Sequence, residues 1–296
     1  MHDPLVYRSE EILLSLGAEN IAHSNGTLFD HLLGTQRILS CWGAPDYVAR
    51  GGLVHSVYST QYFREGPTDL RCRADIEALV GSASERLAFL FSILDRQYLW
   101  SAVATTNLPS TVSIPCHSDR REVQLDRATL QDLALLECAN YVEQCSEADG
   151  SPGLWVSWVL RTLTALDYPD LCPALLSLRR IKDEDENRAR QLYLTALVLG
   201  TAEAWERLQN VIELNPNVGE PYIFLSLIEL GQGNWAAARS YADSADNKFR
   251  TLGSSWDQRM SFSRWVALPP QLAQAANARR GEVALGLKEI AAFAGP

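Results

Sequence analysis

The sequence predicts an all-α protein, and three observations support this prediction. Residue patterns that begin and end helices recur along the chain, whereas patterns typical of strands are scarce. Hydrophobic residues make up 47% of the chain and charged residues 21%, which are ordinary values for a folded globular protein. The second half contains a repeat of 34 residues. At 296 residues, the chain is long enough for one large or two ordinary domains.

Glycine, proline and short polar side chains set the predicted helix ends of the first half. Asn25-Gly26-Thr27 precedes a helix that begins at Leu28 and ends at Gly43, and Pro45 opens the next helix. Further helices are predicted at 10–16, at 73–80, from 84 through the apolar window 87–94, and from 126 to 145.

Two polar stretches interrupt the helices of this half. Residues 105–122 contain two prolines and many Ser and Thr, so they predict a loop with at most one short strand, at 111–114. The stretch 146–153 (SEADGSPG) predicts a boundary between two domains, 1–147 and 154–296.

The first copy of the repeat ends at Pro216, and the second copy begins at Gly219. In the second copy, small side chains follow the turn Gly233-Asn234-Trp235 at helical spacing, at Ala238, Ala242 and Ala245. Small residues that let paired helices approach closely are typical of the tetratricopeptide repeat, which this segment resembles. The resemblance implies stacked helical hairpins, capped by flanking helices at 155–166 and 262–287. An ordinary helical bundle with accidental periodicity is the alternative.

Composition and short motifs exclude several function classes. The formal net charge of −10 and the absence of a Lys/Arg block argue against nucleic acid as a ligand. The N-terminal sequence has no apolar run, and the window 87–94 is far shorter than the roughly 18 residues that a membrane span needs. We therefore expect a soluble, cytoplasmic protein without a membrane partner, whose six cysteines are free thiols. The sequence contains no GxGxxG, Walker, HExxH or GxSxG motif, so nothing in it indicates a dehydrogenase, an ATPase, a zincin or a serine hydrolase.

Three segments of the first half indicate a metal site. They are 23–31 (HSNGTLFDH), 52–60 (GLVHSVYST) and 135–140 (LLECAN), and His31 and His55 are 24 residues apart. His31 shares an inward helical stripe with Leu28 and Thr35, and Gly51-Gly52 precedes His55 by one turn.

These segments resemble the HD superfamily, most closely its stringent-response nucleotide hydrolases. The strings HSxGTLxDHLxGT and GLxHSVYxT are also typical of a bacterial domain family of unassigned function. The resemblance covers roughly residues 10–145. It implies an HD-like helical bundle in which His31, His55 and Asn140 hold a divalent metal ion, namely Mn, Fe or Zn.

The sequence departs from the HD pattern at two ligand positions. Ser56 stands where the family has the Asp of its His-Asp pair, and Asn140 stands where it has the final Asp. Both replacements remove negative charge and weaken the binding of a hard or borderline cation. Glu137, one helical turn before Asn140, is a candidate replacement carboxylate. Tyr58, one turn past His55, is interpreted as either a core aromatic residue or a proton donor.

Two functional hypotheses follow from these features. In the first, the protein is a hydrolase or a related enzyme with an HD-like, single-metal pocket, which acts on a small metabolite that can be anionic. Its catalytic candidates are His55, Glu137 and Tyr58. In the second, the protein is a non-catalytic HD-like and tetratricopeptide-like scaffold, whose repeat half binds a partner protein or forms a homodimer. The metal content of the purified protein distinguishes the two.

Overall fold

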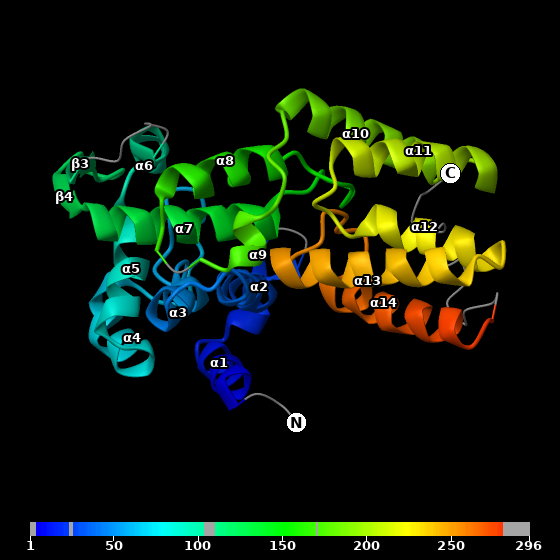
Figure 1. Cartoon of the computed structure of the whole chain (residues 1–296). Coiled ribbons are helices and arrows are strands. Elements are labelled where there is room, and N and C mark those ends of the chain that lie inside the picture. Colours follow the sequence, from blue (N-terminus) through cyan, green and yellow to red (C-terminus); the bar gives the residue numbers. More distant parts are fainter. Residues whose placement is uncertain (1–3, 24–25, 104–109, 170, 281–296) are drawn as a thin grey trace. The chain divides into compact units, whose positions relative to one another are not determined.

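The computed structural model describes residues 4–23, 26–103, 110–169 and 171–280. These residues are mostly helical, in agreement with the predicted class (Figure 1). Within the described ranges, strands occur only in two small antiparallel sheets. The chain forms two compact units: unit 1 comprises residues 1–144 and 161–172, and unit 2 comprises 145–160 and 173–296.

Unit 1 is built from seven labelled helices with short connections. They are α1 (Pro4–Ser15), α2 (Leu28–Cys41), α3 (Asp46–Val54), α4 (Arg73–Val80), α5 (Ser82–Ile93), α6 (Arg96–Val103) and α7 (Arg127–Gln144). Single 3-10 turns occur at Ala18–Asn20 and Leu70–Cys72. The strands are β1 (Ala22–His23) paired with β2 (Gly26–Thr27), and β3 (Thr111–Pro115) paired with β4 (Glu122–Asp126). Helix α8 (Val156–Leu166) contributes residues to both units.

The start and the end of α2 follow from its sequence. Thr27 and Asp30 form a capping box, in which the Thr27 hydroxyl accepts a hydrogen bond from the Asp30 backbone N–H at 3.2 Å and the Asp30 carboxylate accepts one from the Thr27 N–H. Beyond the other end, Gly43 adopts a φ of 79°, which favours glycine. Pro45 then precedes α3. These two boundaries are therefore local and were predicted correctly.

Two adjacent glycines allow other helices to approach α3 closely. A Cβ atom at Gly52 would lie 2.5 Å from Leu39 Cδ1 of α2. A Cβ atom at Gly51 would lie 3.3 Å from Leu87 of α5. Because neither glycine has a side chain, α2 and α5 both pack against α3, and the residues at its C-terminal end are buried. The core around them is apolar, with members from α1 to α5 and their connections: Ile12, Leu13, Ala18, Leu28, Leu32, Leu53, Val54, Val57, Tyr58, Ile76, Val80 and Ala88.

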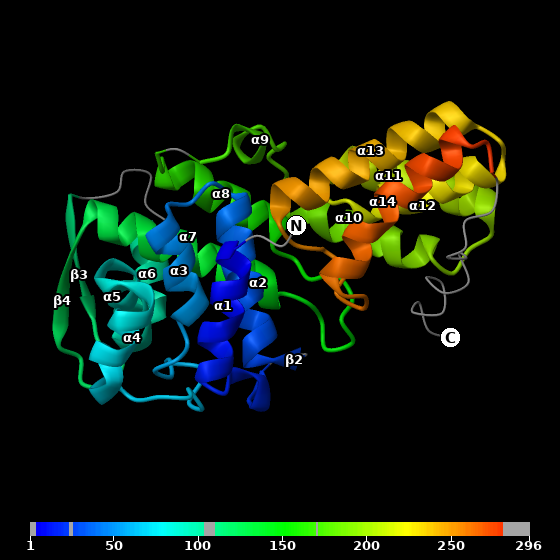
Figure 2. The ribbon, with the colours of Figure 1, turned by 90° about the horizontal axis from the view of Figure 1, so that it is seen from below.

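The predicted loop at 105–122 is wrong in part, and 104–109 lie outside the described residues. Strand β3 extends the one predicted strand to Pro115, and β4 pairs with it in the register Thr111↔Asp126 to Pro115↔Glu122. Figures 1 and 2 both show the two strands side by side. Helix α6 was also not predicted, although Asp95 accepts a hydrogen bond from the Gln97 N–H at 3.1 Å at the start of the helix.

The segment 161–172 completes unit 1 through polar contacts. Tyr168 Oη donates to Asp132 Oδ1 at 2.6 Å, and Gln131 Nε2 donates to the Leu166 carbonyl at 2.6 Å. The Cys172 N–H donates to the Trp42 carbonyl at 2.8 Å. The predicted domain 1–147 omits this segment, so the division of the chain differs from the predicted one here.

Unit 2 consists of helices that follow one another with short turns. They are α9 (Pro173–Leu176), α10 (Asp183–Ala196), α11 (Thr201–Leu214), α12 (Glu220–Gly231), α13 (Trp235–Leu252) and α14 (Phe262–Asn277). Each helix from α10 to α13 packs against the next, and α14 packs against both α13 and α12. Helix α14 ends at Asn277, and residues 281–287 of the predicted helix at 262–287 lie outside the described residues.

Helices α12 and α13 form an antiparallel pair. Ser226 Oγ, in the middle of α12, donates to the Ala238 carbonyl at 2.7 Å, and Gly219, directly before α12, lies against the Phe249 ring. The three alanines of the predicted stripe, Ala238, Ala242 and Ala245, are completely buried. The predicted helix pair over 219–245 is therefore confirmed, and α13 continues beyond it to Leu252.

None of the helices within the described ranges combines the length and the apolar character that crossing a membrane requires.

Candidate functional site

Two histidines of unit 1 lie in contact in its interior. His31 is in the first turns of α2, and His55 caps the C-terminus of α3. Their Nε2 atoms are 3.1 Å apart, and both rings are buried, with 2% and 0% of their surface exposed. The 24-residue spacing predicted that the two rings would lie close together, and they do.

In each histidine the inner nitrogen, Nε2, faces the other ring, and the outer nitrogen, Nδ1, has a partner of its own. His55 Nδ1 lies 2.7 Å from the Gly52 carbonyl oxygen. Because a carbonyl only accepts, Nδ1 carries the hydrogen and His55 Nε2 presents a lone pair. His31 Nδ1 contacts Glu143 Oε2 of α7. Both inner nitrogens therefore face each other, while a carbonyl and a carboxyl group hold the outer ones.

Two amide side chains of α7 complete the cluster. Asn140 Oδ1 lies 3.0 Å from His55 Nε2. Gln144, one helical turn later, donates from Nε2 to Asn140 Oδ1 at 3.0 Å, and the same nitrogen lies 3.1 Å from His31 Nε2. The predicted set of His31, His55 and Asn140 thus lies within hydrogen-bonding distance, with Gln144 as a fourth member that the sequence did not identify.

Burial keeps both imidazoles neutral. Removal from water and, to a smaller extent, the positive charge of Arg96 lower the pKa of His31 to about 3. Removal from water and the neighbouring His31 lower the pKa of His55 well below its usual value. Burial also raises the pKa of Glu143 to about 8, against the effect of Arg37. Neutral imidazole is the form in which histidine binds a metal ion.

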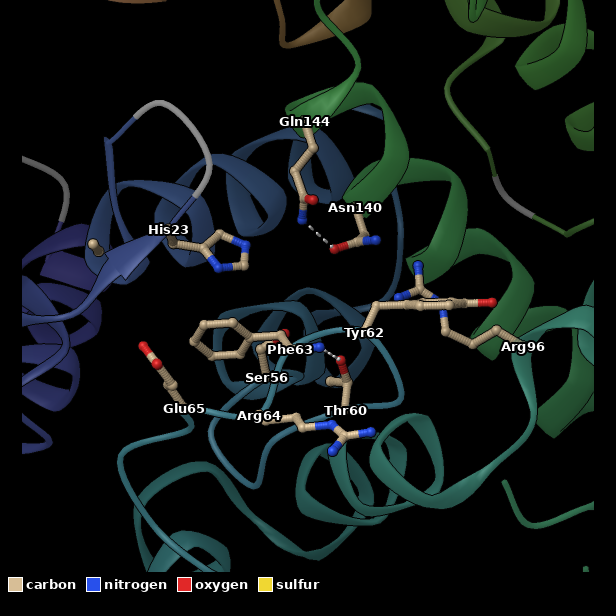
Figure 3. A pocket seen from close by; sticks show the side chains of 11 residues that line it. His23, Ser56, Thr60, Tyr62, Phe63, Arg64, Glu65, Arg96, Asn140 and Gln144 are labelled. Carbon is tan, nitrogen blue, oxygen red and sulfur yellow. Dashed lines mark hydrogen bonds between the residues drawn. The ribbon is translucent and has the colours of Figure 1, made fainter. Parts of the chain in front are cut away.

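A pocket of about 530 Å³ adjoins the cluster. Asn140 and Gln144 line it, whereas the two buried histidines do not. Figure 3 shows these amides and His23 directed towards a space that loop residues bound on the opposite side. The full lining is Ala22, His23, Ser56, Thr60, Tyr62, Phe63, Arg64, Glu65, Arg96, Asn140 and Gln144.

The loop from Ser56 to Gly66 is fastened to itself. Ser59 adopts a φ of 70°, and its hydroxyl accepts a hydrogen bond from the Gly66 N–H at 3.1 Å. A Cβ atom at Gly66 would lie 2.3 Å from the Ser59 nitrogen and 2.6 Å from the Val57 carbonyl oxygen, so only glycine fits there. Four consecutive residues that line the pocket, from Tyr62 to Glu65, belong to this loop.

His23 stands between the pocket and the cluster. Its ring centroid is 4.4 Å from that of His31 and 4.6 Å from that of Phe63. Its Nε2 atom is buried and makes no hydrogen bond within the described part of the chain. Burial and the nearby His31 lower the pKa of His23 to about 4, so this ring is also neutral at physiological pH.

The structure does not bring Glu137 to the histidine pair. Its Oε1 accepts hydrogen bonds from Arg96 Nε, at 2.8 Å, and from Arg96 Nη2. Its Oε2 is buried without a hydrogen bond to the described residues. Burial raises the pKa of Glu137 to about 7, while Arg96 opposes the rise. The expected replacement carboxylate is instead the counter-ion of an arginine that lines the pocket.

Tyr58 also lies apart from the pair. Its hydroxyl donates to Glu85 Oε1 at 2.9 Å, and Arg73 donates to both oxygens of the same carboxylate at 2.6 and 2.7 Å. Burial and the bond to Glu85 raise the pKa of Tyr58. Of the two interpretations of this residue, the core aromatic fits this position and the proton donor does not.

The donor atoms of the cluster determine which cation it would fit. No group of three or more His, Cys, Asp or Glu side chains that could hold a metal ion occurs in the part of the chain that the structure describes. The available donors are two imidazoles and amide oxygens, all neutral. Imidazole suits zinc and iron, whereas manganese is better served by carboxylates. These residues therefore fit Zn or Fe(II) better than Mn.

Comparison with known proteins gives one similarity. Residues 12–96 match a family described as a domain of unknown function (DUF6817). The matched range contains His23, His31, His55 and Arg96, but not the amides of α7. No curated protein and no solved structure matches the chain.

Proposed function

We propose that unit 1 is an HD-like, single-metal pocket that hydrolyses a small anionic metabolite. The observation that carries this proposal is the convergence of two neutral imidazoles. Two ligands of one tetrahedral ion, each at about 2.0–2.1 Å, lie about 3.3 Å from each other. The 3.1 Å between His31 Nε2 and His55 Nε2 is close to that value.

The second reason is the orientation of each ring. Histidines that bind metals donate their other N–H to a carbonyl or a carboxylate. His55 faces the Gly52 carbonyl, and His31 faces Glu143. His31 and His55 would hold the cation through Nε2, with Asn140 through Oδ1. A cation held there would lower the pKa of a bound water and so supply a nucleophile at neutral pH.

The pocket next to the cluster suits an anion. Arg96 and Arg64 line it, and the Ser56 and Thr60 hydroxyls lie in the same wall. Arg96 is held between Glu137 and the rings of Tyr62 and Phe91, whose centroids lie 5.2 and 4.9 Å from its guanidinium carbon. A fixed guanidinium binds carboxylate or phosphate oxygens with defined geometry, so these groups would orient the substrate.

For unit 2 we propose a tetratricopeptide-like array. Helices α11 and α13 begin at Thr201 and Trp235, which are 34 residues apart, the length of that repeat. Such an array would present a surface for a protein partner or a second copy of the chain.

A non-catalytic protein is the second candidate function. It is favoured by the neutral donor set, since the one carboxylate expected to assist the histidines is bound to Arg96. In that case the histidines are structural and the repeat half provides the function.

Metal binding by the purified full-length protein tests the proposal. We expect about one equivalent of Zn²⁺ or Fe²⁺ per chain by elemental analysis and calorimetry, and loss of that binding in His55→Gln. His117→Gln is the matched control, because His117 lies outside the cluster and contacts the Ser92 carbonyl. Release of phosphate from a panel of phosphate esters should require the same metal. A wild-type protein that binds none of Zn²⁺, Fe²⁺ and Mn²⁺ would refute the enzyme proposal in favour of the non-catalytic one.

A further inference from the structure

We infer that Glu143 is a positioning residue that fixes the ring of His31 and directs its Nε2 atom towards the cation. This inference rests on the proposed metal site and adds a residue to it. The direct observation is the contact between Glu143 Oε2 and His31 Nδ1. When a cation takes the lone pair of Nε2, a neutral ring must carry its hydrogen on Nδ1, and an oxygen of the Glu143 carboxyl group accepts it.

The space for this carboxyl group is created by Gly34. A Cβ atom at that position would lie 2.7 Å from Glu143 Cγ and 3.0 Å from Oε1. Gly34 is in the middle of α2, where glycine weakens a helix, and one turn after His31. The missing side chain therefore has a specific effect: it lets a side chain of α7 reach the outer face of His31.

Helix α7 supplies the carboxylate and the amides from a single turn. Glu143 is three residues after Asn140 and directly precedes Gln144, so all three side chains point to one side of the helix. Asn140 and Gln144 contact the inner nitrogens, while Glu143 contacts the outer one. Helix α7 thus places the two amides against the histidines and also orients the ring of His31.

The two histidines are therefore held by different kinds of group. His55 depends on the Gly52 backbone carbonyl, which no substitution of a side chain removes. His31 depends on a side chain from another helix. A substitution can therefore test what orients His31, whereas it cannot remove the partner of His55.

Glu143→Gln is the test variant, because glutamine keeps the size of the side chain and replaces its carboxyl group by an amide. We expect its affinity for Zn²⁺ to fall 10- to 100-fold, with an unchanged melting temperature of the metal-free protein. Gly34→Ala, which leaves Glu143 in the sequence but takes its space, should lower the affinity in the same direction. Glu77→Gln, at an exposed position of α4, and Gly231→Ala, whose Cβ meets no atom within 4 Å, are the matched controls.

The hydrogen bond made by His31 Nδ1 provides a readout that a general structural defect would not reproduce. In the zinc-loaded wild type, ¹H–¹⁵N spectra of the imidazoles should show the Nδ1 proton of His31 far downfield, because a Glu143 oxygen accepts it, and Glu143→Gln should move that resonance. Wild-type affinity and an unmoved Nδ1 resonance in Glu143→Gln would overturn the inference and leave the metal site standing. A wild type that binds no Zn²⁺ would overturn the proposed function, and the role of Glu143 with it.

Discussion

The Phe249 ring lies directly over Gly219 in unit 2, which makes Gly219→Ala a sensitive test of this packing. A Cβ atom at Gly219 would lie 2.7, 2.8 and 2.9 Å from three carbons of that ring. Real Cβ contacts are longer, so either the ring or α12 would have to move. The backbone at Gly219 has a φ of −85°, which alanine adopts without strain, so the contact with the ring and not the backbone angle opposes the substitution.

The ring has little freedom to yield. Phe249 is 1% exposed, and its other neighbours include Trp265, stacked at 6.1 Å between centroids, and Phe262 at 6.3 Å. Adding a methyl group to a packed core costs about 1–3 kcal/mol. Because the neighbour is a rigid aromatic ring, we expect a cost of at least about 1 kcal/mol for Gly219→Ala.

Gly231→Ala is the matched control in the same helix. Its Cβ atom would meet nothing within 4 Å, and alanine is the better helix former by up to about 1 kcal/mol. The two substitutions are chemically identical, yet their effects on the free energy of unfolding should differ in sign. Urea unfolding followed by circular dichroism measures both. A Gly219→Ala protein as stable as the wild type would refute the packing of α12 against α13 described above.

Three further predictions concern stability and the cysteines. Ala238→Leu should lower the free energy of unfolding by about 1–3 kcal/mol, seen as a lower melting temperature, because Ala238 is completely buried and its carbonyl accepts a bond from Ser226. Burial raises the pKa of Glu220 from 4.5 to about 8, so the folded chain keeps a proton that the unfolded chain has lost in this window. Stability should therefore fall as pH rises from about 5 to 8, by at most about 1.4 kcal/mol per pH unit for one proton. Glu220→Gln, which still accepts from the Trp256 and Asp257 N–H groups, should flatten this fall; an unchanged slope would contradict it. Thiol titration of the denatured, unreduced protein should find six free groups, and fewer would reveal a disulfide.

Local signals account for what the sequence predicted of the fold. The capping box at Thr27 and the left-handed Gly43 each set a helix end through contacts within a few residues. The helix pair over 219–245 likewise depends on a short turn and on alanines at helical spacing. By contrast, β4 (Glu122–Asp126) alternates polar and apolar residues over only five positions, and it follows a Pro- and Ser-rich stretch that predicts a loop; its pairing with β3 makes it a strand.

The candidate site shows the same limit. The 24-residue spacing, the inward helical stripe of His31 and the two glycines before His55 predicted the contact of the two rings. The partner of Glu137 could not be predicted, since Arg96 is 41 residues away and belongs to a helix without a recognised start. Glu143 and Gln144 had a usable signal, because they are three and four residues after Asn140 and so share its side of the helix.

The return of the chain to unit 1 at residues 161–172 affects the order in which the protein can be made and divided. A nascent chain that ends at residue 147 lacks Tyr168, and its buried Asp132 would have one hydroxyl donor, Tyr47, instead of two. At about 5–20 residues per second, translation takes a few more seconds to reach residue 172. Unit 1 can therefore complete its folding only after residues 145–160 of unit 2 have been synthesised. A recombinant fragment intended to carry the histidine cluster should for the same reason extend through Cys172.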